Sequence, residues 1–74
     1  MDRNSVIWRL QRGAERYEAV VNQGEQGCEL GFFQNGRLLQ RMWLAAGRGL
    51  GAVEEALARR DALKASGWRE CRDH

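Results

Sequence analysis

Few residues of this chain combine a type and a spacing suited to chemistry. The only histidine, His74, is the final residue of 74. A general base must be held against the group from which it takes a proton, and chain ends are poorly held. The carboxylates are scattered or are spaced as structural partners of arginines. We therefore expect no catalytic residue and no enzymatic activity.

The two cysteines, Cys28 and Cys71, form no metal-binding or disulfide pattern, because no short spacing links them. Cys28 falls in a predicted strand with its side chain toward the core, where a thiol acts as a small hydrophobic group. Cys71 is expected to be exposed, with no firmly held base nearby that would activate it. We expect two free thiols, no metal ion and no cofactor.

A glycine-rich run before the predicted helix, Gly47-Arg48-Gly49-Leu50-Gly51-Ala52, fits the dinucleotide-binding pattern Gly-x-Gly-x-x-Gly/Ala. That pattern binds a cofactor within a parallel strand–helix–strand unit. Here the preceding strand closes an antiparallel hairpin, and no comparable strand follows the helix. A phosphate-binding loop would also need Gly-Lys-Ser/Thr, which is missing. The run is interpreted as a flexible link, with weak anion binding at the helix start as the alternative.

The composition indicates one small globular domain. Twelve basic against ten acidic residues give a net charge of only +2, and 43% of the residues are hydrophobic. We predict a single domain over residues 4–68, followed by a flexible polar tail over residues 69–74. No apolar run approaches the roughly 18 residues of a membrane helix. The N-terminus lacks the basic start and the apolar stretch of a signal peptide, so we expect a cytoplasmic protein.

Hydrophobic periodicity predicts an antiparallel sheet followed by a helix. The alternation indicates strands over residues 6–11, 16–22, 27–33 and 38–44. A helix over about residues 50–65 presents an apolar stripe made of Ala52, Val53, Ala56, Leu57 and Leu63. Gly67 is expected to end this helix in the left-handed conformation and to let Trp68 fold back onto the apolar layer. The predicted fold is α+β: a four-stranded antiparallel β-meander packed on one C-terminal α-helix.

The turn between the last two strands decides which side chains face the core. Asn-Gly between alternating apolar runs is a strong hairpin signal. A two-residue Asn35-Gly36 turn would mix charge into both faces and make Trp43 a core residue. A three-residue Gln34-Asn35-Gly36 loop keeps the apolar residues together and sets Glu29 opposite Arg41. We predict the three-residue loop.

In this register the sheet has one face toward the helix and one outer face. The inward residues are Val6, Trp8, Leu10, Tyr17, Ala19, Val21, Cys28, Leu30, Phe32, Leu38, Met42 and Leu44. The outer face then carries five large apolar residues among charged ones: Ile7, Val20, Phe33, Leu39 and Trp43, with Arg9, Arg16, Glu18, Glu29 and Arg41. A solvated sheet face is normally polar, whereas aromatic and arginine side chains are enriched at interfaces.

We predict a non-catalytic interaction module that forms a homodimer, or binds a protein partner, through this face or through an edge of the sheet. The candidate interaction residues are Ile7, Arg9, Val20, Phe33, Leu39, Arg41 and Trp43. The alternative is nucleic-acid binding by the same arginine and aromatic residues, although Glu18, Glu29 and the low net charge oppose it. A third interpretation is that these apolar residues are dispersed, as on many protein surfaces. Neither membrane contact nor a small-molecule substrate is predicted.

The part of the chain before the Ala/Glu/Arg-rich helix carries a series of structural glycines, core aromatic residues and their neighbours. The series consists of Trp8, Leu10, Gly13, Tyr17, Glu18, Gly27, Glu29, Phe32, Asn35, Gly36, Leu38 and Leu44. Over about residues 6–67 this order resembles a group of short uncharacterised bacterial proteins of similar length. The resemblance supports the fold and implies no activity. Those proteins have no glycine cluster before the helix, so residues 47–51 depart from their pattern.

Two further resemblances concern single segments. Residues 20–26, Val-Val-Asn-Gln-Gly-Glu-Gln, resemble the MbtH-like activators of peptide synthetases, but the Trp-Pro signature of that family requires a proline and this chain has none. The last part of the sequence, an Ala/Glu/Leu-rich helix with Lys64 and then Gly67-Trp68, resembles nucleic-acid-binding WGR domains, yet their Trp-Gly-Arg is missing. Neither resemblance therefore assigns a residue a role.

Overall fold

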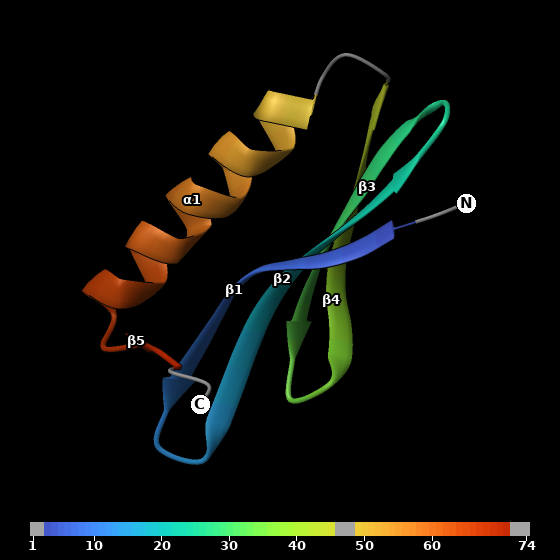
Figure 1. Ribbon diagram of the computed structural model, residues 1–74. Helices are drawn as coiled ribbons and strands as arrows, with labels where there is room; N and C mark the ends of the chain where they lie inside the picture. The colour runs from blue at the N-terminus through green and yellow to red at the C-terminus, as the bar shows by residue number, and fades with distance from the viewer. Residues whose placement is uncertain (1–2, 46–48, 72–74) are drawn as a thin grey trace.

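The computed structural model describes residues 3–45 and 49–71, which fold as one sheet with one helix on it (Figure 1). The elements follow in the order β1 (Arg3–Arg12), β2 (Glu15–Gly24), β3 (Gly27–Gln34), β4 (Arg37–Ala45), α1 (Gly49–Ala65) and β5 (Arg69–Glu70). The first four strands form an antiparallel meander, and α1 is the C-terminal helix. The predicted α+β fold is confirmed.

The sheet gains a fifth strand at one edge, because its order is β4-β3-β2-β1-β5. β5 pairs with the end of β1, with Leu10 opposite Glu70 and Gln11 opposite Arg69. The amide of Cys71 continues this pairing by donating to the Arg9 carbonyl at 2.9 Å. The start of the predicted polar tail is therefore a short edge strand, and residues 72–74 lie outside the described part.

The predicted three-residue loop between β3 and β4 is wrong. Gln34 is opposite Arg37, so the turn consists of Asn35 and Gly36 alone. Both turn residues have positive φ, 53° for Asn35 and 81° for Gly36. This is the signature of the tight turn whose twist matches that of the flanking strands, and Asn-Gly is its preferred sequence.

A bulge in β4 restores the alternation that the shorter turn disturbs. The register shifts between Phe32 and Phe33, so that Leu38 is opposite Phe33 while Gln40 is opposite Phe32. Leu39 is the extra residue between them. Beyond the bulge the faces agree with the prediction: Met42 and Leu44 lie partly buried against the core, and Trp43 stays outside. Before the bulge the prediction is wrong, because Leu38 shares the outer face with Phe33.

A second bulge occurs in β1 and has the same kind of effect. Val6 is opposite Val20, but Trp8 is opposite Ala19, so Ile7 is the extra residue. Val6 therefore lies on the outer face, where it is 44% exposed, and Ile7 packs against the core cluster. The predicted faces of these two residues are exchanged.

The core combines large side chains of the sheet with small ones of the helix. It contains Trp8, Leu10, Tyr17, Ala19, Cys28, Leu30, Phe32, Ala52, Ala56 and Trp68. The Trp8 ring centroid lies 5.8 Å from that of Tyr17 and 6.1 Å from that of Phe32. Alanines let the helix backbone approach these rings closely, so one thin layer of side chains is enough to fill the space. Val53, predicted in the apolar stripe, is instead 40% exposed.

The end of α1 follows the prediction. Gly67 has a φ of 99°, and its amide donates to the Lys64 carbonyl at 3.1 Å. The next amide, that of Trp68, donates to the Leu63 carbonyl at 3.1 Å. This pair of hydrogen bonds satisfies the last carbonyls of the helix and turns the chain back, which buries Trp68 in the core.

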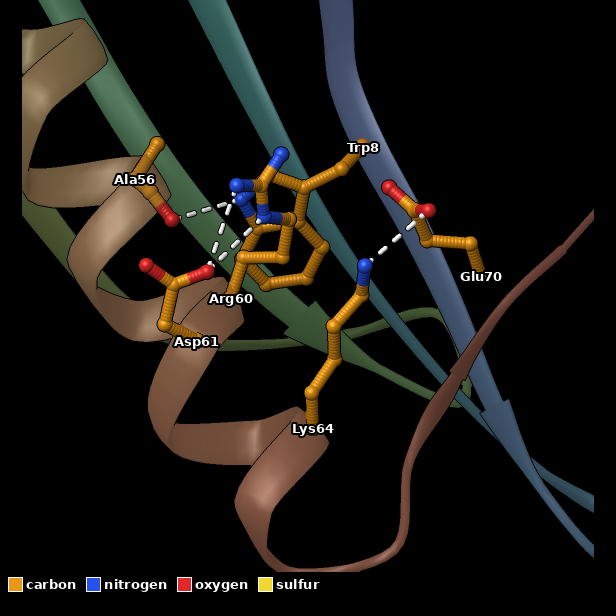
Figure 2. Close-up of polar contacts among 6 residues, drawn as sticks. All are labelled: Trp8, Ala56, Arg60, Asp61, Lys64 and Glu70. Carbon is orange, nitrogen blue, oxygen red and sulfur yellow. Dashed lines mark hydrogen bonds and ion pairs between the residues drawn. The ribbon is translucent and has the colours of Figure 1, made fainter.

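Figure 2 shows a hydrogen bond from β1 to α1 and an ion pair between α1 and β5. The Trp8 indole Nε1 donates to the Ala56 carbonyl at 2.7 Å in a buried position. Near the end of the helix, Lys64 Nζ lies 3.0 Å from Glu70 Oε2, and the two side chains are 40% and 52% exposed. A buried hydrogen bond contributes more to stability than an exposed ion pair.

Trp8→Phe is therefore expected to lower the free energy of unfolding by about 1 to 2 kcal/mol, because it removes the only side-chain donor to Ala56 described here and part of a core side chain. For a chain of this size that corresponds to a fall in the melting temperature of several degrees. Lys64→Met is the control and should cost about 0.5 kcal/mol or less. If thermal unfolding showed the same loss of stability for both variants, the buried hydrogen bond would not be the stronger of the two contacts.

Candidate interaction surface on the sheet

The face of the sheet that points away from α1, called here the outer face, carries the candidate site. Within residues 3–45 and 49–71, no helix or strand covers it (Figure 1). The strand registers place three rows of residues across it: Trp43, Glu29, Asn22 and Asn4; Arg41, Gly31, Val20 and Val6; and Leu38, Phe33, Glu18 and Arg9. Side chains from all four long strands therefore meet on one surface.

A continuous apolar band, made of Val6, Val20, Phe33 and Leu38, crosses the middle of this face. Val6 is opposite Val20, and Phe33 is opposite Leu38. Phe33 joins the two pairs by lying over Gly31: a Cβ added to Gly31 would be 3.0 Å from Phe33 Cε1 and 3.4 Å from Leu38 Cδ1. The glycine therefore provides the space that the aromatic ring covers.

A hollow of about 230 Å³ opens in the outer face where the band passes Gly31. Its lining is partly apolar and partly polar: Asn4, Val20, Asn22, Glu29, Gly31, Phe33, Leu38 and Arg41. Apolar walls with a polar rim resemble the centre of a protein interface, where an anchor side chain enters a pocket surrounded by polar groups.

Charged side chains on both sides of the band are paired within the chain. Arg9 Nε lies 3.1 Å from Glu18 Oε2, and Arg41 Nε lies 3.7 Å from Glu29 Oε2. These pairs are exposed and add little to stability. Each glutamate offsets the charge of a neighbouring arginine, so the face is closer to neutral than its arginine content suggests.

Trp43 is the most exposed large apolar side chain described, at 62% of its full exposure. It is opposite Glu29 at the end of the hairpin. Its ring lies beside Gly27, where an added Cβ would be 2.9 Å from Trp43 Cζ2. A tryptophan with this exposure places a large apolar area in water, which is typical of a contact residue.

The structure brings some of the predicted interaction residues together and separates others. Val20, Phe33 and Arg41 line the hollow, while Arg9 and Trp43 lie on the same face beyond it. Ile7 is not part of the site, because the β1 bulge turns it toward the core. Leu39 is the unpaired bulge residue and lines a separate hollow with Gln34, Asn35 and Arg37.

Sequence alternation missed two members of the apolar band, Val6 and Leu38. Val6 precedes Ile7 and Leu38 precedes Leu39, and in both pairs the second residue is the extra residue of the bulge. Adjacent apolar residues are the available signal for such a bulge, because alternation alone cannot decide which of them faces the core. Gly31, whose missing side chain makes room for the Phe33 ring, gave no signal of this role.

The residues that the sequence analysis considered for metal binding and for chemistry are placed as follows. No group of three or more potential metal ligands occurs among the described residues. Cys28 is buried, and the Sγ of the half-buried Cys71 lies 3.6 Å from Gln11 Oε1. In the glycine-rich run, Gly47 and Arg48 lie outside the described residues, as does His74.

No family model, no curated protein and no solved structure matches the chain. The described part of the chain has no helix long and apolar enough to cross a membrane.

Proposed function

We propose that the protein is a non-catalytic interaction module that self-associates through the outer face of its sheet. The apolar band beside the hollow supports this proposal, because it is continuous and is left uncovered by the described elements. Large contiguous apolar patches are uncommon on monomeric proteins.

We propose the cytoplasm as the compartment of the protein. Free thiols at Cys28 and Cys71 are consistent with a reducing environment.

A second copy of the chain suits the outer face better than a nucleic acid does. Arg9 and Arg41 already have carboxylate partners, Glu18 and Glu29, on the same face. Phosphate binding would have to compete with these ion pairs, and the net charge of the chain is only +2. The apolar band, in contrast, is covered best by another apolar surface.

Leu38→Arg is expected to weaken self-association through this face by about tenfold or more, because it puts a charge into the wall of the hollow. Sedimentation equilibrium at several concentrations measures the effect. Val53→Arg is a matched control, since Val53 is 40% exposed and Leu38 is 43% exposed, but Val53 lies on α1.

Equal masses for Leu38→Arg and the wild type would contradict association through the outer face. A monomeric wild type that is retained on mixed DNA or RNA at low salt, and is released steeply as salt rises, would favour nucleic-acid binding instead. Val53→Arg should keep the wild-type mass, because it changes a residue outside the proposed contact.

A further inference from the structure

The open edge of β4 offers a contact that is separate from the outer face. Of the two outermost positions in the sheet order, one is β4 and the other is the short β5. β5 and the amide of Cys71 occupy the end of the β1 edge, which also contains the Ile7 bulge. In the described part of the chain, β4 pairs with β3 alone. Alternate residues of such a strand have backbone groups directed away from the sheet, where another strand can pair with them.

The usable part of this edge begins after the bulge. From Gln40 to Ala45 the pairing of β4 with β3 is regular, and Arg41 is the only charged residue in the segment. Bulges and charges normally protect an edge strand. Here the bulge, together with Arg37, protects only the part of β4 next to the turn.

We propose that a second copy of the chain pairs antiparallel with this edge, in a register centred on Met42. Met42 then meets Met42 of the second copy, and Arg41 lies opposite Trp43 of the second copy. Two-fold symmetry repeats that pair, so the contact contains two Arg–Trp pairs on the outer face. An arginine guanidinium is attracted to the face of an indole ring. The Trp43 ring is 62% exposed, so it is accessible to Arg41 of the second copy.

This register is favoured over its neighbours by the side chains that it brings together. A shift by one residue would place inward side chains on the outer face. A register centred on Arg41 would put the two arginines opposite each other, which is unfavourable. One centred on Trp43 would leave Arg41 opposite Ala45. Only the register centred on Met42 gives Arg41 an aromatic partner in both copies.

The edge contact goes beyond the proposed function and does not depend on it. It joins two sheets side by side and places their outer faces on the same side of the joined sheet. The apolar bands remain uncovered in this arrangement and can still pair face to face. Edge pairing alone therefore gives a dimer, and the two contacts together give a tetramer.

Charge substitutions at Trp43 test the edge register by sedimentation equilibrium. Trp43→Arg places like charges opposite each other across the edge and should weaken edge pairing by about tenfold or more. Trp43→Glu places a carboxylate opposite Arg41 and should retain pairing. The double variant Arg41→Glu/Trp43→Arg reverses the charges and should recover it. Circular dichroism checks that each variant is folded.

The expected masses separate this inference from the proposed function. In the Leu38→Arg background, where the outer faces no longer pair, edge pairing predicts a dimer, which added Trp43→Glu keeps and added Trp43→Arg converts to a monomer. Equal weakening by Trp43→Arg and Trp43→Glu, or no recovery in the double variant, would overturn the edge contact. If Leu38→Arg has the wild-type mass and the Trp43 series behaves as expected, the edge contact stands and the face contact fails.

Discussion

Phe32→Ala is expected to lower the free energy of unfolding by about 3 to 5 kcal/mol, enough to unfold much of a small domain near physiological temperature. Phe32 is 1% exposed and belongs to the core cluster, together with Ala52 and Ala56 of α1. Its ring also lies beneath the Arg59 guanidinium, with Cζ 4.4 Å from the ring centroid. Arg59 in turn donates to Tyr17 Oη at 3.1 Å and to Gln40 Oε1 at 2.8 Å. Removing the ring therefore leaves a cavity and takes away the support of this group.

The adjacent residue provides a matched control. Phe33 is the same residue type in the same strand, but it faces the other way and is only partly buried. Phe33→Ala should cost about 1.5 kcal/mol or less in the monomer, and it should weaken self-association instead. Both variants are best measured by urea unfolding in the Leu38→Arg background, because association through the outer face would itself stabilise the native state. If Phe32→Ala and Phe33→Ala lowered the free energy of unfolding by similar amounts, Phe32 could not be the core residue and Phe33 the outer-face residue.

Gly27→Ala is expected to cost about 3 kcal/mol or more and to abolish association. Gly27 has a φ of 154°, which residues with a side chain rarely adopt. An added Cβ would also clash with the backbone oxygen of Leu44 and lie 2.9 Å from Trp43 Cζ2. Relief of these clashes requires β3 and β4 to separate where Trp43 stands. Chemical unfolding and sedimentation should report the two effects together.

Gly13→Ala separates backbone strain from steric exclusion. Gly13 also has a positive φ, 62°, but nothing lies within 4 Å of an added Cβ. Its replacement should cost about 1 to 2 kcal/mol, the penalty of the left-handed conformation, and leave association unchanged. A loss for Gly27→Ala no larger than that for Gly13→Ala would show that the close approach of β3 and β4 is unimportant.

The strands, the helix and its end could be predicted from the sequence because the local signals agree. Gly67 ends α1 as expected, and Trp68 returns to the core. Asn35-Gly36 also marked its turn correctly. The length of that turn was wrong because the bulge that follows could not be seen: the tight turn shifts the register by one residue, and Leu39 shifts it by one more in the same direction, which restores the alternation of faces.

The candidate site was predicted only in part for the same reason. Trp43 reaches the outer face as expected, because the predicted and observed registers beyond the bulge differ by two residues. Phe33 reaches it because β3 alternates without an extra residue. Val6 and Leu38 could not be assigned, since either member of an adjacent apolar pair can face the core. The contacts of Arg59 with Tyr17 and Gln40 depend on where α1 crosses the sheet, which no local pattern determines.

The central claim is that the uncovered sheet supports self-association, and the mass of the wild-type protein in solution tests it most directly. Sedimentation equilibrium should give a concentration-dependent mass that approaches a multiple of the 8.5 kDa chain. Val53→Arg should follow the same curve, and Leu38→Arg should fall below it. A constant mass of 8.5 kDa at concentrations up to about 1 mM would mean that the chains associate too weakly to form an oligomer at these concentrations. That result would contradict the claim.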